Sequence, residues 1–208
     1  DAVAVWDTME ALAYSGVGTV FGYGGGSRDS AMLKYISPSM AGVQLELGYI
    51  FKDNYNSYGP FGAFGADSTN GKYDIALIYK AQKITAGLTY SHTSVKTGGA
   101  HRSNVENMSV GASYDFGPFK AAASYHHNDQ RIGVAYAAGS WQSPGIKGGS
   151  LGVTVPLQQI SLSADAVYAK ERAGTKKSGT DLVFTAKHML SKRTSVYGVY
   201  RYADKSGP

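Results

Sequence analysis

The 208-residue chain contains no cysteine, only six prolines and no long apolar run. Without cysteine it can form no disulfide, use no thiolate nucleophile and build few of the usual structural zinc sites. No apolar stretch approaches the roughly 18 residues that a membrane-spanning helix needs, so a helical membrane protein is excluded. A membrane β-barrel remains open, because alternating strands hide half of their residues from any hydropathy average.

Charge and histidine content also exclude several classes of function. The net charge of +5 is spread along the chain, whereas a nucleic-acid binder gathers its basic residues on one face, so we expect no nucleic-acid partner. His126 and His127 are adjacent on a predicted strand and point to opposite faces, and the other histidines have no acidic residue at ligand spacing. We therefore expect no metal and no cofactor.

The most informative stretch is residues 28–51, which predicts two strands joined by a turn. In its second half Val43, Leu45 and Leu47 alternate with polar residues such as Gln44 and Glu46, the period of two that a half-buried strand requires. The turn between the strands contains a proline and closes on a glycine.

The same alternation recurs to residue 202 and predicts about ten strands of nine to eleven residues. Short connections are expected at 37–42, 81–83, 116–118, 156–159 and 191–193. Long ones are expected at 52–71, 93–106, 128–149 and 172–179. The chain lacks a secretory signal and stops just after a strand, so we expect it to be part of a longer protein.

Aromatic residues gather at both ends of the apolar face, with aliphatic residues and alanines between them. Near the short turns these are Tyr35, Tyr79, Tyr114, Phe116 and Phe119, and near the long loops they are Tyr49, Phe51, Tyr73, Tyr90, Tyr125, Tyr168 and Tyr202. Such girdles are typical of membrane–water interfaces. A soluble β-sandwich with one solvated face, the alternative, has no reason to place aromatics at both rims. Because open sheet edges are not tolerated in hydrocarbon, we expect an all-β, transmembrane antiparallel β-barrel.

Two stretches carry a resemblance to a known family. The segment LKYISP at 33–38, followed by Ala41 and Gly42, resembles the segment after the constriction loop of Gram-negative general porins of the β-proteobacterial and neisserial type. The segment LSKRT at 190–194, followed by Val196 and Tyr197, resembles the hairpin two strands before the C-terminus of those porins.

The resemblance covers essentially the whole chain and implies a sixteen-stranded homotrimeric barrel in the bacterial outer membrane. It implies a channel and no enzyme, contacts with outer-membrane lipid and lipopolysaccharide, and passage of small hydrophilic solutes and ions. Residues 1–27 resemble the constriction loop that folds into the lumen, and residues 28–208 would be barrel strands with short periplasmic turns and long extracellular loops. The first strands and the terminal strand of the family are absent.

Selectivity in such a pore depends on its diameter and on the charges that face one another across it. By resemblance, the candidates on the loop side are Asp1, Asp7 and Glu10. By strand parity, the candidates on the wall side are Arg28, Lys34, Glu46, Asp74, Lys120 and Arg201. The loop is poor in acid and the wall leans basic, so we predict a weak anion preference.

Two alternatives come from other classes. An outer-membrane protease or lipase would need Ser, His and Asp converging at one rim, but no recognisable motif such as G-x-S-x-G is present. An adhesive or structural barrel would work through its long loops. The outward alanines are small enough to lie against a neighbouring subunit; they are Ala112, Ala121, Ala123, Ala164, Ala166 and Ala186.

Overall fold

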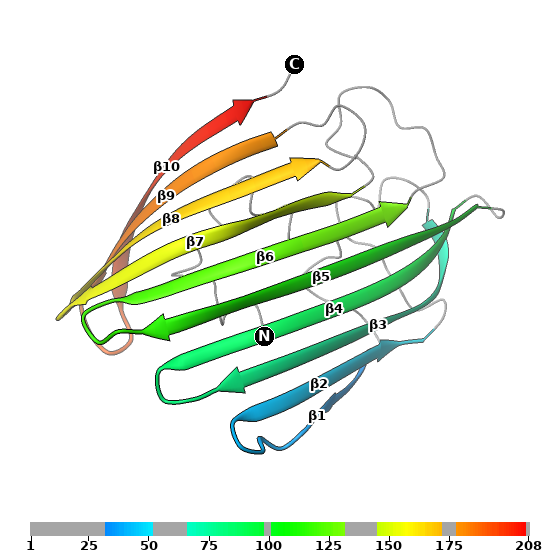
Figure 1. Cartoon of the computed structure of the whole chain (residues 1–208), viewed down its shortest axis with the longest axis horizontal. Coiled ribbons are helices and arrows are strands. Elements are labelled where there is room, and N and C mark those ends of the chain that lie inside the picture. Colours follow the sequence, from blue (N-terminus) through cyan, green and yellow to red (C-terminus); the bar gives the residue numbers. More distant parts are fainter. Residues whose placement is uncertain (1–31, 52–65, 98–100, 132–144, 172–177, 207–208) are drawn as a thin grey trace.

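The structure, a computed structural model, describes residues 32–51, 66–97, 101–131, 145–171 and 178–206. These residues form ten strands: β1 (Met32–Ile36), β2 (Val43–Ile50), β3 (Ala66–Lys80), β4 (Ile84–Thr97), β5 (His101–Asp115), β6 (Lys120–Arg131), β7 (Ile146–Leu157), β8 (Ile160–Glu171), β9 (Ser178–Met189) and β10 (Ser195–Ser206). All ten form one antiparallel sheet in chain order (Figure 1). The described part of the chain contains no helix that is long and apolar enough to cross a membrane.

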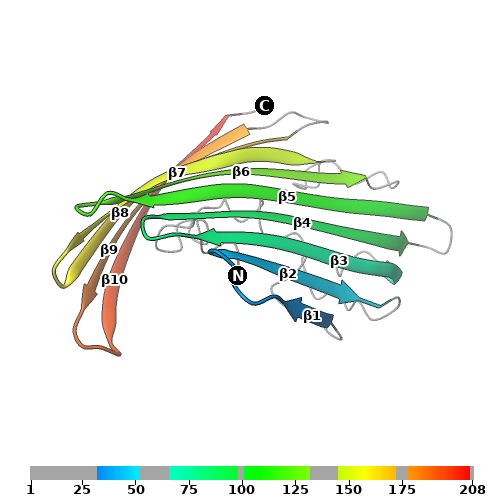
Figure 2. The ribbon, with the colours of Figure 1, turned by 60° about the horizontal axis from the view of Figure 1, so that its bottom comes forward.

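The sheet is curved into an open trough, with β1 and β10 as its two edges (Figures 1 and 2). The predicted number of strands is confirmed, but β3 to β10 are longer than the predicted nine to eleven residues, and β1 and β2, with 5 and 8 residues, are shorter. β3 and β5 have 15 residues each, and β6 to β10 have 12 each. At about 3.3 Å per residue, twelve residues reach roughly 40 Å, enough to cross a hydrocarbon core of about 30 Å at a tilt.

The loop predicted at 93–106 is wrong. β4 continues to Thr97, β5 begins at His101, and their register continues without a break to the pair Thr97 and His101. The loop predicted at 52–71 is also too long, because β3 begins at Ala66. In the sequence, residues 66–71, 93–97 and 101–106 are mainly polar at both parities, so the period of two that marks a strand is lost there. The backbones of these residues nevertheless belong to β3, β4 and β5.

The first hairpin turns where the sequence predicts it. Ala41 and Gly42 both have positive φ values, 49° and 84°, which is the geometry of a two-residue type I′ hairpin turn. A Cβ atom on Gly42 would lie 2.4 Å from the backbone oxygen of Lys80 on β3. Glycine is therefore required at this position by conformation and by space.

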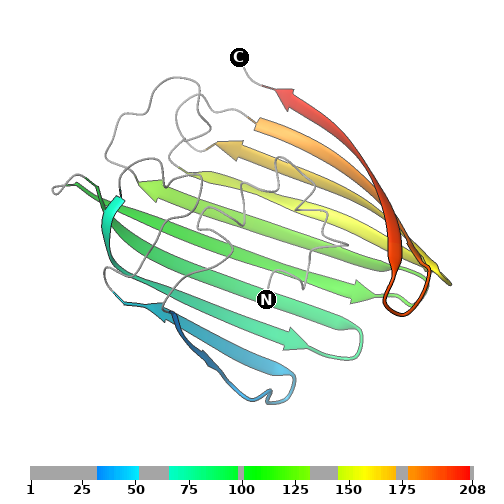
Figure 3. The same cartoon turned by 180° about the vertical axis from the view of Figure 1, so that it is seen from behind.

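The two faces of the sheet carry opposite chemistry. On the convex face large apolar side chains are exposed, for example Leu151 at 67% and Leu33 at 66%. The concave face points toward the viewer in Figure 3. It contains the buried polar residues, including Asp181 at 0% and His126 at 2% exposure. This is the reverse of a soluble protein, whose buried residues are mainly apolar.

Aromatic clusters lie on the convex face at both strand ends, as predicted. At the short-turn end Phe116 is 4.5 Å from Tyr114 and stacks on Phe119 at 4.6 Å between ring centroids. At the other end the rings of Tyr73 and Tyr90 lie 6.0 Å apart. Amphipathic rings at these two levels fit the two interfaces of a bilayer.

Candidate functional site

The concave face is held by ion pairs that join neighbouring strands. Lys34 on β1 contacts Glu46 on β2, with 2.7 Å between Nζ and Oε2. At the opposite edge the Arg201 guanidinium on β10 donates to both carboxylate oxygens of Asp181 on β9, at 3.1 and 3.4 Å. Asp181 is fully buried, whereas the Arg201 side chain is 34% exposed, so the arginine presents positive charge to the trough.

A third ion pair lies within one strand. Lys72 and Asp74 are two residues apart on β3, so they share the concave face, with 3.5 Å between Nζ and Oδ2. Asp74 was predicted as a wall residue. Lys72 and Asp181 were not predicted as wall residues. Lys72 lies an even number of residues from Asp74 on the same strand, and Asp181 pairs with Arg201 on the same face. Strand parity is therefore the signal that could have found both.

The predicted wall residues are placed as follows. Lys34, Glu46, Asp74, Lys120 and Arg201 all belong to the concave face, on β1, β2, β3, β6 and β10. Within this set, Lys34 and Glu46 form an ion pair with each other. The remaining predicted residues, Asp1, Asp7, Glu10 and Arg28, lie outside the described residues.

At the centre of the concave face, His126 on β6 is hydrogen-bonded through both ring nitrogens. Its Nδ1 lies 2.8 Å from Oγ of Ser109 on β5, and its Nε2 lies 2.8 Å from Oγ of Ser124. Oγ of Ser124 is 2.6 Å from Oγ of Ser150 on β7. The network therefore links three strands, and both ring nitrogens meet hydroxyl groups.

A second polar network lies closer to the long connections. Nδ2 of Asn128 donates to Oδ1 of Asn107, and Nδ2 of Asn107 donates to Oγ of Ser91 at 3.2 Å. These amides and hydroxyls join β4, β5 and β6. No group of three or more His, Asp or Glu residues suited to a metal ion occurs in the described part of the chain.

The concave face can therefore present charges and hydrogen-bonding groups to water, while the convex face presents apolar groups to lipid. Comparison with known protein families gives a match over residues 1–208 to the Gram-negative porins. The chain belongs to this family. Family membership locates this porin chain in the bacterial outer membrane.

Solved structures share the fold of this porin chain. An anion-selective porin from Comamonas acidovorans has a TM-score of 0.66 and 21% identity over 84% of this chain and 48% of its own. OmpF of Salmonella typhi, in complex with daunomycin, has a TM-score of 0.64 and 14% identity over 83% of this chain and 54% of its own. A loop L8 deletion mutant of OmpT, an outer membrane protein of Vibrio cholerae, has a TM-score of 0.64 and 14% identity over 97% of this chain and 68% of its own.

The porin chain thus spans about half the length of the first two of these structures. No match is found among curated proteins.

Proposed function

We propose that this chain forms much of the wall of a water-filled channel through which small hydrophilic solutes and ions diffuse passively. The observation that carries the proposal is the inversion of the two faces, with Asp181 and His126 on the concave face and exposed leucines on the convex one. Open sheet edges are not stable in hydrocarbon, so β1 and β10 require further strands. We propose sixteen strands in the closed barrel and three barrels in the assembly.

The test is the conductance of the complete protein in planar lipid bilayers. A porin gives stepwise current increases that are proportional to voltage. An adhesive or structural barrel, the second candidate, gives negligible conductance. A correctly folded protein without conductance would therefore overturn the proposal.

We propose a weak anion preference, because exposed basic groups outnumber exposed carboxylates among the described residues of the concave face. Glu46, Asp74 and Asp181 are each paired with a cation. Lys120 and Lys187 form no ion pair within the residues that the structure describes, and both are exposed. The similarity to an anion-selective porin from Comamonas acidovorans supports the same sign. A reversal potential showing clear cation selectivity in a salt gradient would contradict it.

Residues 1–27 remain proposed as the constriction loop, with Asp1, Asp7 and Glu10 as its charges. Replacing Asp7 and Glu10 by lysine would then increase anion selectivity, because both charges would lie at the narrowest point of the pore. The reversal potential measures this effect. No change in the double variant would remove these residues from the constriction.

We propose that the protein is not an enzyme, although the contact between Ser124 and His126 resembles half of a hydrolase triad. In such a triad the second ring nitrogen donates to a carboxylate, whereas here it meets the hydroxyl of Ser109. His126 is also only 2% exposed, which leaves little room for a substrate. Esterase and protease assays on the purified barrel test this, and activity lost in Ser124→Ala would contradict it.

A further inference from the structure

The net positive charge of this chain is concentrated at one end of the strands, the end of the short turns at the left of Figure 1. The short-turn rim comprises the five short connections and the four adjoining residues of each strand, all of which the structure describes. It contains seven basic and two acidic residues, so its net charge of +5 equals that of the whole chain. Lys34 and Glu46 pair with each other. The other basic residues of the rim are Lys80, Lys83, Lys120, Lys187, Lys192 and Arg193, and the other acidic residue is Asp115.

Three lysines of the rim face the trough. Each lies six residues along its strand from a residue of the concave face, and an even spacing places two residues on the same face of a strand. All three lysines are exposed and form no ion pair within the residues that the structure describes. Each lysine and the concave-face residue on its strand are Lys80 and Asp74 on β3, Lys120 and His126 on β6, and Lys187 and Asp181 on β9.

The interior of the trough, which is the concave face beyond the rim, does not share this excess of positive charge. Lys72 pairs with Asp74 there, and its charge is balanced within β3. Arg201 pairs with Asp181 across β9 and β10. With Asp165 on β8, the described side chains of the interior include two basic and three acidic groups. An anion preference in this part of the barrel therefore depends on the rim.

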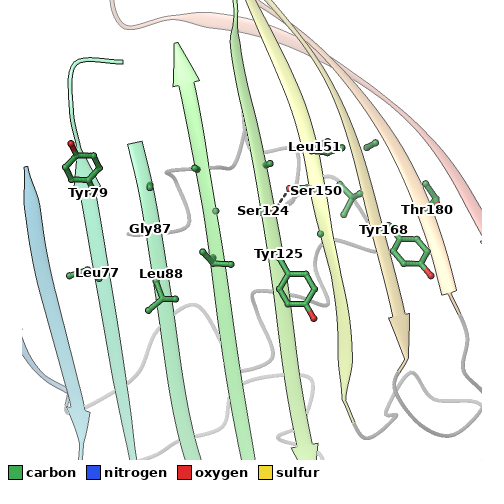
Figure 4. Close-up of a pocket in the computed structure, with 18 residues that line it drawn as sticks. Leu77, Tyr79, Gly87, Leu88, Ser124, Tyr125, Ser150, Leu151, Tyr168 and Thr180 are labelled. Atoms are coloured by element: carbon green, nitrogen blue, oxygen red, sulfur yellow. Dashed lines mark hydrogen bonds between the residues drawn. The ribbon is translucent and has the colours of Figure 1, made fainter. Parts of the chain in front are cut away.

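The convex face of the same strands is apolar, and this strengthens the field that the rim lysines produce in the trough. A groove of about 820 Å³ crosses β3 to β9 on the convex face, with Leu77, Leu88 and Leu151 among its lining residues (Figure 4). Lipid against such a surface has a low dielectric constant and contains no ions that could screen a charge. The field is therefore focused into the water on the concave side, where it raises the local concentration of anions.

The lysines that face the trough are spaced three strands apart, on β3, β6 and β9. At about 4.8 Å between strands, neighbouring lysines are roughly 14 Å apart along the sheet. The Debye length is about 30 Å at 0.01 M salt and about 10 Å at 0.1 M salt. In dilute salt the three charges therefore act as one field, whereas in more concentrated salt each is screened from the others.

We propose that the short-turn rim is the anion-selecting mouth of the channel and that it acts from one side only. Lys80, Lys120 and Lys187 concentrate small anions at this mouth when the bath that faces the short turns is dilute. A dilute bath on the opposite side has little effect, because the concentrated solution at the rim then screens the lysines. The inference rests on the proposed channel function and assigns its selectivity to named residues.

The test uses the complete protein in planar bilayers of phosphatidylcholine, which has no net charge, with potassium chloride at about 0.1 M in one bath and about 0.01 M in the other. Gln159→Cys lies in a short turn, and in a protein otherwise free of cysteine it identifies the bath that faces the short turns. A maleimide polymer too large for the pore reacts with it from that bath alone. The anion-to-cation permeability ratio, calculated from the reversal potential, should be higher when the dilute bath faces the short turns than when the gradient is inverted.

Lys120→Gln/Lys187→Gln should abolish this difference between the two gradient directions and lower the permeability ratio to one or below. The variant leaves Lys80 balanced by Asp115, which lies opposite Lys120 in the register, so the trough keeps no excess of positive charge. The matched control is Lys147→Gln/Lys170→Gln, which removes two exposed lysines from the convex face at the other end of the strands. The control should keep the ratio and the asymmetry of the wild type.

A substitution of the opposite sign gives an independent measurement if the double lysine variant does not fold. Asp115→Asn removes a negative charge from the rim but keeps the oxygen that accepts the hydrogen bond from the backbone N–H of Gly117, at 2.7 Å. The permeability ratio should rise in this variant, and most strongly with the dilute bath at the short turns.

A conducting wild-type protein with equal ratios in the two gradient directions would overturn this inference and leave the channel function standing. So would an unchanged ratio in the folded double lysine variant, or a ratio that falls equally in the control. A folded protein without conductance would instead overturn the channel function on which the inference depends.

Discussion

The convex and concave faces of this sheet come from the same strands but meet different surroundings. Leu151 is 67% exposed on the convex face of β7, whereas Val167 and Asp181 are completely buried on the concave face of β8 and β9. A fold that buries carboxylates and exposes leucines is unstable when water surrounds it. It becomes stable when lipid covers the exposed leucines. The difference between the faces is therefore evidence for the environment as well as for the fold.

The largest effect is expected from placing a charge on the convex face midway between the aromatic clusters. Leu77 on β3 lies opposite Leu45 and Leu88, between Tyr73 and Tyr79 of the same strand. Leu77→Arg should lower the free energy of unfolding from lipid bilayers by about 2–4 kcal/mol. Equilibrium unfolding in urea from lipid vesicles measures this change.

The matched control is Ala76→Arg, one residue away on the concave face. Ala76 lies opposite Glu46 in the register, so the new arginine would face water and a carboxylate. Its effect on the folding free energy should be below about 1 kcal/mol. Equal losses in the two variants would contradict the assignment of the faces.

The next largest effect is expected at the fully buried carboxylate of the concave face. Asp181→Ala removes both hydrogen bonds from Arg201 and leaves that guanidinium without this partner. We expect a loss of about 1.5–3 kcal/mol in folding free energy, the usual range for hydrogen bonds to charged groups. Asp204→Ala, at an exposed position on β10, is the control and should have little effect. A loss as small as that of the control would mean that the pair does not stabilise the sheet.

A smaller effect is expected from His126→Ala at the centre of the concave face. The substitution leaves the hydroxyls of Ser109 and Ser124 without their ring partner, at a cost of about 1–3 kcal/mol. Single-channel conductance should change little, because the ring is only 2% exposed. Thermal unfolding and conductance, measured on the same preparation, separate the two effects. A large conductance change would mean that the ring borders the water path.

Much of the fold follows from the period of two. That pattern identifies ten strands and assigns Leu77, Val110 and Leu162 to the convex face, where they are exposed. It fails beyond His92 on β4 and before Glu106 on β5, where the two strands still pair. Alternation reports a difference between lipid and water, so it disappears wherever both faces of a hairpin carry polar residues.

The contacts of the candidate site are less predictable than its faces. Parity places Arg201 and Asp181 on the concave face, but Arg201 lies opposite Val183 and Asp181 opposite Ala203. Their ion pair is therefore diagonal, and it depends on a strand register that the sequence does not state. The same is true of Lys34 and Glu46, since Lys34 lies opposite Gly48. Sequence parity alone therefore overstates the charge that the trough presents.

The smallest effect on stability is expected at Lys34 and Glu46, where selectivity is the informative measurement. The Lys34 side chain is 42% exposed, so breaking the pair should cost less than about 1 kcal/mol. Lys34→Ala removes a positive charge and should shift the reversal potential toward cations, whereas Glu46→Ala should shift it toward anions. In the double variant the two shifts should cancel, because the pair contributes almost no net charge to the water path. If neither single variant moved the reversal potential, this end of the trough would not border the conducting path, and the two faces would differ in packing but not in function.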